Sequence, residues 1–382
     1  MSKLRIAHFI SAFEAGGIQS LVASLAKAQA CDGADVWVCA IYPQGAHNQC
    51  PVDDRVQHIG FEWHGVHDVG SLGRIRHFLH HNQIKILHTH PGTLSRLTGI
   101  LARVPIIVST LHGSWPTSNM VTRAVQRWLA NRTTMIVANS NYTKGFYAGL
   151  LDLDESRLMT IYNGIDLSRF EHIDELPRRE QRAHFDLPSD AKVVTYVGRL
   201  HPDKGVDVLI SAARTVINAA ADVHFLIVGE GESRSDLEQQ ACASGIGERI
   251  RFVGALADVR EALAVTDVFV LPSSRREGFG LSLVEAMAMK LPAVATNIGG
   301  ISEIVIHGFN GLLSKPGDVK TLAQAITAFL NNQELAQQLA RNARRTVQER
   351  FSLERMIKDY HLLYQSLVEK SVSVIGNTHS VG

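Results

Sequence analysis

The sequence predicts an α/β protein made of two doubly wound, Rossmann-like domains that face each other across a cleft. Short apolar runs rich in β-branched residues alternate with helical patterns, and this alternation occurs twice along the chain. A charged segment bracketed by prolines, 174–190, separates the two series. The chain has 382 residues, of which 45% are hydrophobic and 20% charged, so it is long enough for two hydrophobic cores.

The first series predicts a parallel sheet in an amino-terminal domain, residues 1–173. Its strands are expected at 5–10, 35–42, 85–90, 105–113 and 134–140. After the first strand, Ile18, Leu21, Val22 and Leu25 recur at helical spacing, which predicts an amphipathic helix that Gly33 ends.

The second series predicts a carboxy-terminal domain, residues 191–351, with 174–190 as the linker before it. Its strands are expected at 192–198, 224–229, 250–254, 268–273 and 292–296. One helix is expected to bury a face made of Val206, Leu209, Ile210, Ala213 and Val216. Helical patterns also cover 320–331 and 352–370, and the tail 371–382 is expected to be flexible.

Charge and cysteine content narrow the class of protein. The net charge is +1, so no global field attracts the chain to nucleic acid, and no nucleic-acid partner is expected. Cys31, Cys39, Cys50 and Cys242 form no C-x-x-C pair, and no signal peptide is recognised, which favours a reducing cytoplasm. No apolar run reaches the roughly 20 residues that span a bilayer, although surface attachment would need none.

The segment "EGFGLSLVEA" places two carboxylates around a glycine turn. Gly278 and Gly280 follow an expected strand and precede a helix, where backbone N–H groups favour a bound phosphate. Glu285 has an alternative role, because Ser282 and Glu285 match the S-x-x-E pattern of a capping box. Glu277 either complements the helix dipole or accepts hydrogen bonds from neutral sugar hydroxyls.

Two further glycine segments follow expected strands of the second domain. In "GRLHPDKG", Arg199 and Lys204 flank a tight turn closed by Gly205, which suits a diphosphate, although this segment taken alone favours a solvated loop. "VGEGES" begins like a dinucleotide fingerprint, but Arg234 stands where its third glycine should be, so an NAD-dependent oxidoreductase is disfavoured.

These motifs, with "NGID" at 163–166, resemble those of the retaining glycosyltransferases of family four, which have the GT-B fold. The resemblance is strongest over 192–315 and looser in the amino-terminal half, through 14–26, 86–92 and 109–113. It implies transfer of a sugar from a nucleotide-sugar, with a UDP-sugar favoured, and a last helix that returns to the amino-terminal domain. A sugar-nucleotide epimerase of the same fold and a non-enzymatic nucleotide-sugar sensor are the alternatives.

The resemblance also implies the roles of individual residues. Arg199 and Lys204 would clamp the donor diphosphate, Glu277 would hold hydroxyls of the transferred sugar, and Glu285 would bind the ribose. The remaining expected contacts are backbone approaches to the donor and one histidine near the reacting sugar, at Gly16, Gly17, Gly278, Phe279, Gly280, Leu281 and His112. Lys290 stands where related sequences have glycine or another small residue.

Neither a catalytic metal nor a cofactor is expected. "DLD" at 152–154 imitates a metal-binding motif but follows a helical pattern, so a loop is favoured. His77, His80, His81, His88 and His90 are not expected to bind a metal, because zinc needs three or four convergent ligands. In similar retaining enzymes the leaving phosphate accepts the proton of the acceptor on the same face of the sugar, without the carboxylate pair of a glycosidase.

The resemblance favours as acceptor a growing surface polysaccharide or a lipid-linked glycan. The segment 122–132 places Arg123, Arg127 and Arg132 beside Trp128 and Leu129, which would suit an anionic membrane, although a solvated helix face is favoured. A cytoplasmic location is therefore expected, with peripheral contact at the inner face of the plasma membrane left open. The sequence does not predict the oligomeric state.

Overall fold

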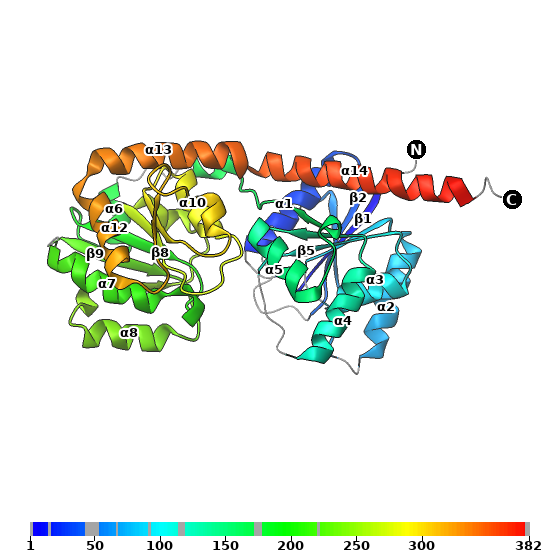
Figure 1. Cartoon of the computed structure of the whole chain (residues 1–382), viewed down its shortest axis with the longest axis horizontal. Coiled ribbons are helices and arrows are strands. Elements are labelled where there is room, and N and C mark those ends of the chain that lie inside the picture. The colour runs from blue at the N-terminus through cyan, green and yellow to red at the C-terminus, as the bar shows by residue number, and fades with distance from the viewer. Residues whose placement is uncertain are drawn as a thin grey trace. The chain divides into compact units, whose positions relative to one another are not determined.

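The computed structural model describes residues 3–13, 17–42, 53–65, 68–90, 93–113, 119–171, 178–219 and 222–378. The chain divides into two compact units, Met1–Gly164 with Leu353–Gly382, and Ile165–Ser352. Each unit contains a parallel sheet with helices packed against it (Figure 1). The predicted α/β class with two Rossmann-like domains is confirmed.

The sheet of the first unit has the strand order β3-β2-β1-β4-β5-β6-β7. All of its strand pairs are parallel, and the order reverses direction between β1 and β4. The strands are β1 (Arg5–Ile10), β2 (Asp35–Ala40), β3 (Val56–Gly60), β4 (Ile86–Thr89), β5 (Ile106–Leu111), β6 (Met135–Ala138) and β7 (Leu158–Thr160). The sequence predicted five of them and missed the two edge strands, β3 and β7.

The α-helices of the first unit are α1 (Gly17–Cys31), α2 (Val69–His81), α3 (Thr93–Leu101), α4 (Met120–Asn131), α5 (Asn141–Leu151) and α14 (Leu353–Thr378), with the short helix η1 (Glu155–Arg157). Helix α14 packs on this unit as expected, because the Tyr360 hydroxyl lies 2.9 Å from Thr110 Oγ1. The last helix was expected to end at residue 370 and instead continues to Thr378, and residues 379–382 of the expected tail lie outside the described residues.

The sheet of the second unit has the order β10-β9-β8-β11-β12-β13, also parallel throughout. Its strands are β8 (Lys192–Val197), β9 (Val223–Val228), β10 (Ile250–Gly254), β11 (Val268–Leu271), β12 (Ala293–Thr296) and β13 (Leu312–Ser314). Here the order reverses between β8 and β11. In open α/β sheets such a reversal leaves a crevice at the carboxyl ends of the two strands, where ligands bind.

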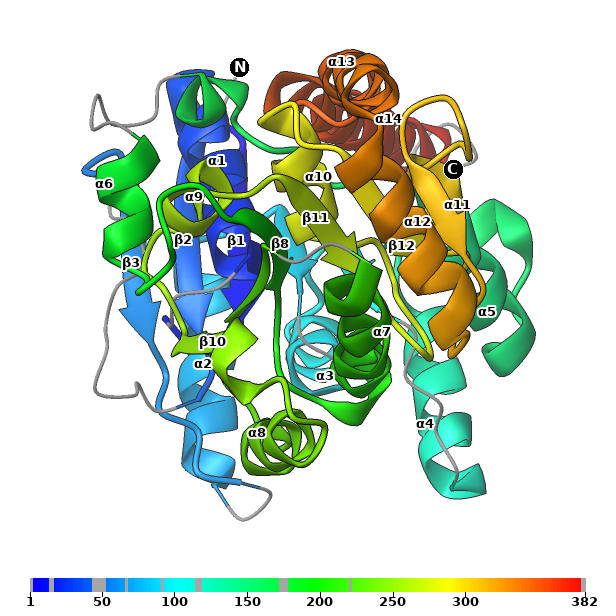
Figure 2. The ribbon, with the colours of Figure 1, turned by 90° about the vertical axis from the view of Figure 1, so that its left-hand side faces the viewer.

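The second unit contains η2 (Leu167–Phe170), α6 (Arg178–Ala183), η3 (Pro202–Lys204), α7 (Val206–Ala219), α8 (Arg234–Ala243), η4 (Gly247–Arg249), α9 (Arg260–Ala264), α10 (Leu281–Ala288), α11 (Ile301–Ile304), α12 (Val319–Asn331) and α13 (Gln333–Arg350). Helix α7 lies beside α12, and α10 lies beside α13 (Figure 2). The predicted apolar face of α7 is buried. The sequence did not predict α13.

The units divide between Gly164 and Ile165, rather than after residue 173. Of the expected linker, residues 178–190 are described, and they pack on the second unit. Phe185 and Leu187 are buried there, and the Arg182 guanidinium lies 3.0 Å from Asp267. This part of the segment is therefore a structural element of the second unit. Within the described ranges, no helix combines the length and apolarity needed to cross a bilayer.

Candidate active site

The loops that follow β8 and β11 are joined through their backbones at the switch point of the second unit. Ser274 N and Arg275 N donate hydrogen bonds to the Asp203 carbonyl at 3.0 and 3.3 Å. Gly205, with φ of 67°, faces the same segment, and a Cβ there would lie 2.1 Å from the Pro272 carbonyl oxygen. Only glycine permits this approach, so the two loops form one fixed surface.

A third loop joins this surface behind Glu277. Gly300 N donates to the Glu277 carbonyl at 2.9 Å. Gly299, with φ of 58°, approaches the same peptide so closely that a Cβ would lie 2.1 Å from that oxygen. The backbone of Glu277 is therefore held against the loop that contains Gly299 and Gly300.

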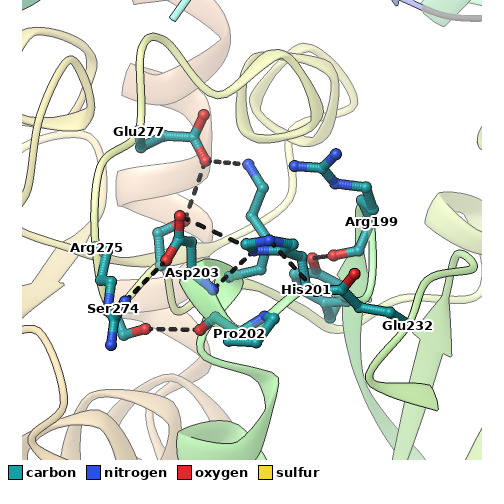
Figure 3. Close-up of polar contacts among 11 residues, drawn as sticks. Arg199, His201, Pro202, Asp203, Glu232, Ser274, Arg275 and Glu277 are labelled. Atoms are coloured by element: carbon teal, nitrogen blue, oxygen red, sulfur yellow. Dashed lines mark hydrogen bonds and ion pairs between the residues drawn. The ribbon is translucent and has the colours of Figure 1, made fainter. Parts of the chain in front are cut away.

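The carboxylate of Glu277 pairs with Lys204. Lys204 Nζ lies 2.6 Å from Glu277 Oε2, and Ser273 Oγ donates to the same oxygen at 3.1 Å (Figure 3). Glu277 is only 8% exposed, so the pair is partly shielded from water. The structure thus brings together two residues that the sequence placed in one site, and shows them neutralising each other without ligand.

Arg199 supplies a second cation at the same place. Its side chain is exposed and, within the described part of the chain, has neither a hydrogen-bond nor an ion-pair partner. In the view of Figure 3, the side chains of Arg199 and Glu277 point to the same side of the loop. The hydroxyl of the buried Tyr196 donates a hydrogen bond to the Arg199 carbonyl at 2.9 Å, which supports the turn.

Sequence reasoning missed the residues that shape this loop. His201 is the N-cap of η3 and accepts a hydrogen bond from Asp203 N at Nδ1, at 3.1 Å. Its Nε2 lies 3.5 Å from Glu232, and the Asp203 carboxylate lies 3.7 Å from Arg275. Part of the signal was present, because proline is favoured at the first helical position, whereas histidine is not a usual N-cap residue.

Helix α10 starts beside this pair without a side-chain cap. Gly280 is its N-cap, with φ of 93°, and no side chain accepts from the first turn. The capping box that Ser282 and Glu285 suggested is therefore wrong, because Ser282 lies inside the helix and not at its N-cap. The uncapped helix start retains its affinity for an anion.

Glu285, in α10, is a partly buried acid. Burial raises its pKa to about 7; Arg169 opposes this effect, and Asp258 adds to it. No hydrogen bond to its carboxylate is found among the residues with described positions. A carboxylate in this condition is able to accept hydrogen bonds from a ligand hydroxyl pair.

The turn between the two glutamates offers its backbone only. Phe279 is 2% exposed, and its ring packs edge-on against Phe351 at 5.5 Å. Gly278 is buried and Leu281 is the first residue of α10. These positions are compatible with the backbone contacts expected of Gly278, Phe279, Gly280 and Leu281.

In the first unit, His112 belongs to a network of histidines at the ends of β1, β4 and β5. His112 Nε2 lies 3.1 Å from His90 Nδ1, and His90 Nε2 lies 3.4 Å from His8 Nδ1. His8 is in turn bonded to Gln29 at 2.7 Å. Burial lowers the pKa of His8 and of His112 to about 4, so this chain of imidazoles is neutral near pH 7.

His88 lies beside this chain, and its two ring nitrogens are 2.7 Å from Thr110 Oγ1 and from the Tyr364 hydroxyl. Burial lowers the pKa values of His88 and His90 well below the usual range. The nitrogens of His8, His88 and His90 lie within 4.8 Å of one another, so they are the described residues best placed for a metal. Their hydrogen bonds already use the ring nitrogens, which favours a polar network.

The network borders a cavity of about 410 Å³. Its polar lining includes His90, His112, Arg96 and Gln126, and leucine and isoleucine side chains supply much of the apolar lining. Gly17 begins α1 and directly precedes Ile18, which lines the cavity; Gly16 lies outside the described residues. The histidines at 77, 80 and 81 lie on α2, where the rings of His77 and His81 stack at 5.7 Å.

The "DLD" segment has structural roles, as its interpretation as a loop predicts. Asp152 is the C-cap of α5, with φ of 49°, and pairs with Arg127 at 2.8 Å. Asp154 is the N-cap of η1 and accepts from Ser156 N at 2.8 Å. Hydrogen bonds from the Ser156 hydroxyl and from its backbone N–H lower the pKa of the Asp154 carboxyl.

Two doubly wound units, one of them with cations and an uncapped helix at its switch point, define the class as a protein of the GT-B type. Two family models match the chain, "Glycosyl transferases group 1" over residues 177–346 and "Glycosyltransferase Family 4" over residues 15–169.

Curated relatives agree with these models. The chain is 30% identical over 338 residues to a phosphatidyl-myo-inositol mannosyltransferase of Mycobacterium leprae, covering 84% of this chain and 85% of that protein. It is 29% identical over 315 residues to UDP-Gal:alpha-D-GlcNAc-diphosphoundecaprenol alpha-1,3-galactosyltransferase of Escherichia coli, covering 79% and 81%.

Solved structures share the fold. A glycosyltransferase of Rickettsia africae superimposes with a TM-score of 0.84 at 21% identity, covering 96% of this chain and 99% of that one. Anabaena HepE, solved with UDP and glucose, gives 0.82 at 24% identity, covering 95% and 100%. The chain belongs to the group 1 glycosyltransferases of family four, which confirms the resemblance; the epimerase and sensor alternatives are not favoured.

Proposed function

We propose that this glycosyltransferase uses a UDP-sugar, retains the anomeric configuration and requires neither a metal nor another cofactor. The observation that supports the proposal most is the grouping of Arg199, Lys204 and Glu277 beside the uncapped start of α10. Relatives are named for capsular polysaccharide synthesis, for lipopolysaccharide core synthesis and for transfer to a diphosphoundecaprenol-linked sugar, and HepE was solved in complex with UDP-glucose. The acceptor is accordingly a glycan or a lipid-linked glycan, in surface polysaccharide or glycolipid synthesis.

The Lys204–Glu277 pair gives the proposal a binding step. A diphosphate at the start of α10 competes with Glu277 for the Lys204 ammonium, because its charge is larger and Arg199 adds a second cation. Once Lys204 turns to the diphosphate, the Glu277 carboxylate becomes available to sugar hydroxyls. Glu285 accepts hydrogen bonds from the ribose.

The chemical step breaks the bond between the anomeric carbon and the diphosphate oxygen. A bond to the acceptor oxygen forms on the same face, and the acceptor proton passes to the departing diphosphate. Arg199, Lys204 and the helix start stabilise the negative charge that grows on the leaving group, which lowers the barrier. The products are the glycosylated acceptor and free UDP.

The first prediction is that transfer survives excess EDTA, since protein cations provide the charge that a metal would otherwise supply. A thermal-shift panel of UDP, GDP, ADP and dTDP selects the nucleotide, because a ligand that binds only the folded state raises Tm. Release of that nucleotide from its sugar donor is then measured with and without acceptor and EDTA. Activity abolished by EDTA and restored by magnesium or manganese contradicts metal independence; interconversion of the donor sugar contradicts transfer.

We also propose that helix α4 contacts an anionic membrane. Met120, Val121, Val125 and Trp128 lie along one side of it and are 86%, 70%, 43% and 42% exposed. The Arg132 guanidinium lies 4.1 Å from the centre of the Trp128 ring. An exposed apolar stripe with arginines at its border matches helices that lie in the bilayer interface.

The second prediction is that Val121→Glu with Val125→Glu weakens flotation with phosphatidylglycerol-containing vesicles by at least about tenfold, since two carboxylates replace inserted apolar groups. Transfer to a water-soluble acceptor analogue should be unaffected. Leu362→Glu, at an exposed leucine of α14, is the matched control and should float like the wild type. Equal flotation of the wild type, the double variant and the control would contradict membrane contact and indicate that α4 presents a solvated face.

A further inference from the structure

A basic cavity lies in the second unit, at the opposite end of α10 from the candidate active site. It has a volume of about 740 Å³ and is formed by the residues that end α10, by α13 and by the end of η2. Four cations line it, Lys290, Arg341, Arg344 and Arg345, against one carboxylate, that of Glu171. Helix α10 has eight residues, so the two places are about 12 Å apart along its axis.

One of the four cations has a structural role. Arg344 is buried and donates to the Ala288 carbonyl at 2.7 Å, at the C-terminal end of α10. Its second terminal nitrogen lies 3.1 Å from Glu171 Oε1. Arg344 therefore satisfies the negative end of the helix dipole, and Glu171 balances its charge.

Lys290, Arg341 and Arg345 are not needed to satisfy the C-terminal end of α10, because Arg344 already does so. Arg341 and Arg345 are one helical turn apart on α13, so their like charges face the same cavity and repel each other. Arg345 pairs with Glu349 at 2.7 Å in an exposed contact. Neither Lys290 nor Arg341 has a side-chain partner among the residues whose positions are described.

Lys290 occupies its position at a conformational cost. Its φ is 57°, in the left-handed region that follows a helix end and that glycine adopts most easily. The chain nevertheless has a residue with a long cationic side chain here. Repulsion on α13 and strain at Lys290 both oppose the folded state, and a bound anion would offset the first of them.

We propose that this cavity is a second anion site, distinct from the donor site, that binds a phosphomonoester or diphosphate group. The guanidinium of Arg341 suits bidentate contact with phosphate oxygens, and the Lys290 ammonium adds a point charge. The volume accommodates a phosphorylated ligand of about sugar size. The phosphate belongs either to a soluble molecule or to a lipid headgroup, and the chemistry of recognition is the same.

The test uses inorganic pyrophosphate and calorimetry with the full chain. Arg199→Ala serves as the background, because it is expected to weaken pyrophosphate binding at the proposed donor site. In that background Lys290→Gly with Arg341→Gln should weaken the remaining binding by roughly tenfold for each cation removed. Glycine suits the backbone at 290, so the variant is expected to fold; an unchanged Tm confirms this. Lys320→Gln, which removes an exposed cation of α12, is the control and should bind like the background protein.

Equal affinity in the cavity variant and the control would overturn the proposal, as would the absence of pyrophosphate binding in the Arg199→Ala background. Flotation with phosphatidylcholine vesicles, with and without phosphatidic acid, then separates the sources. Recruitment by phosphatidic acid that depends on Lys290 and Arg341 supports a lipid phosphate. Pyrophosphate binding without such recruitment supports a soluble phosphate.

Discussion

Arg199→Ala is expected to lower kcat/KM by an amount equivalent to ~3–4 kcal/mol, the loss typical of one transition-state donor. The guanidinium is exposed and unpaired in the described chain, so its removal should leave the free energy of unfolding nearly unchanged. Lys204→Ala should slow transfer by a similar amount. Initial rates with the donor chosen by the nucleotide panel measure both effects.

The two variants should differ in stability. Lys204→Ala leaves the shielded carboxylate of Glu277 without its cation, at a cost of about 1–3 kcal/mol in unfolding free energy. Urea denaturation of both variants measures this difference. Arg214→Ala, which removes an exposed arginine of α7, is the matched control. Wild-type turnover in either clamp variant would assign that residue to a solvated loop.

Glu277→Gln and Glu285→Gln are expected to separate sugar recognition from nucleotide recognition. Glu277→Gln should keep or raise affinity for the free nucleoside diphosphate, because Lys204 is released from its ion pair. It should impair binding and turnover of the intact sugar donor. Glu285→Gln should weaken binding of the free nucleoside diphosphate, since a charge-assisted hydrogen bond is roughly twice as strong as a neutral one.

The pKa of Glu285 adds a pH test. With a pKa of about 7, its ionised fraction rises across neutrality, so wild-type nucleotide affinity should rise with pH there and that of Glu285→Gln should not. The folded-state pKa lies above the ordinary 4.5, so ionisation lowers stability as pH rises from 4.5 towards 7. Glu285→Gln should therefore be at least as stable as the wild type above that range.

Calorimetry of the selected nucleotide and its sugar donor decides between the roles, with Glu248→Gln, an exposed acid of η4, as control. Loss of nucleotide affinity in Glu277→Gln alone would reverse the assignment. Unchanged binding and transfer in both variants would make the turn and its carboxylates structural.

The elements predicted from sequence are those with strong periodicity and ample length. The central strands of each sheet are continuous apolar runs because helices cover both faces, and this pattern is visible locally. Strands β7 and β13 have three residues each, too few to show a period. Helix α13 was missed although Ala336, Leu339, Ala340, Ala343 and Val347 recur at helical spacing, because alanines make a weak apolar face.

The candidate site was predicted as a set of residues but not as an arrangement. The motifs placed Lys204 and Glu277 in one site, yet the two residues lie 73 positions apart in the chain, and their ion pair depends on the fold that brings two strand ends together. The capping-box error has the same origin, since S-x-x-E fits a helix start only if the serine precedes the first turn. His8 went unnoticed because its neighbours, His88 and His90, follow in the chain only after residue 80.

The glycine contacts at the switch point restrict how this enzyme is able to evolve. A side chain at Gly205 or Gly299 would collide with a carbonyl oxygen 2.1 Å away, so single substitutions at these positions are expected to be removed by selection. Glu232 and Arg275, with side chains 71% and 70% exposed at the rim, face no such barrier. A lineage that acquires a new donor preference is therefore expected to drift at the rim while the loop backbones beneath it stay invariant.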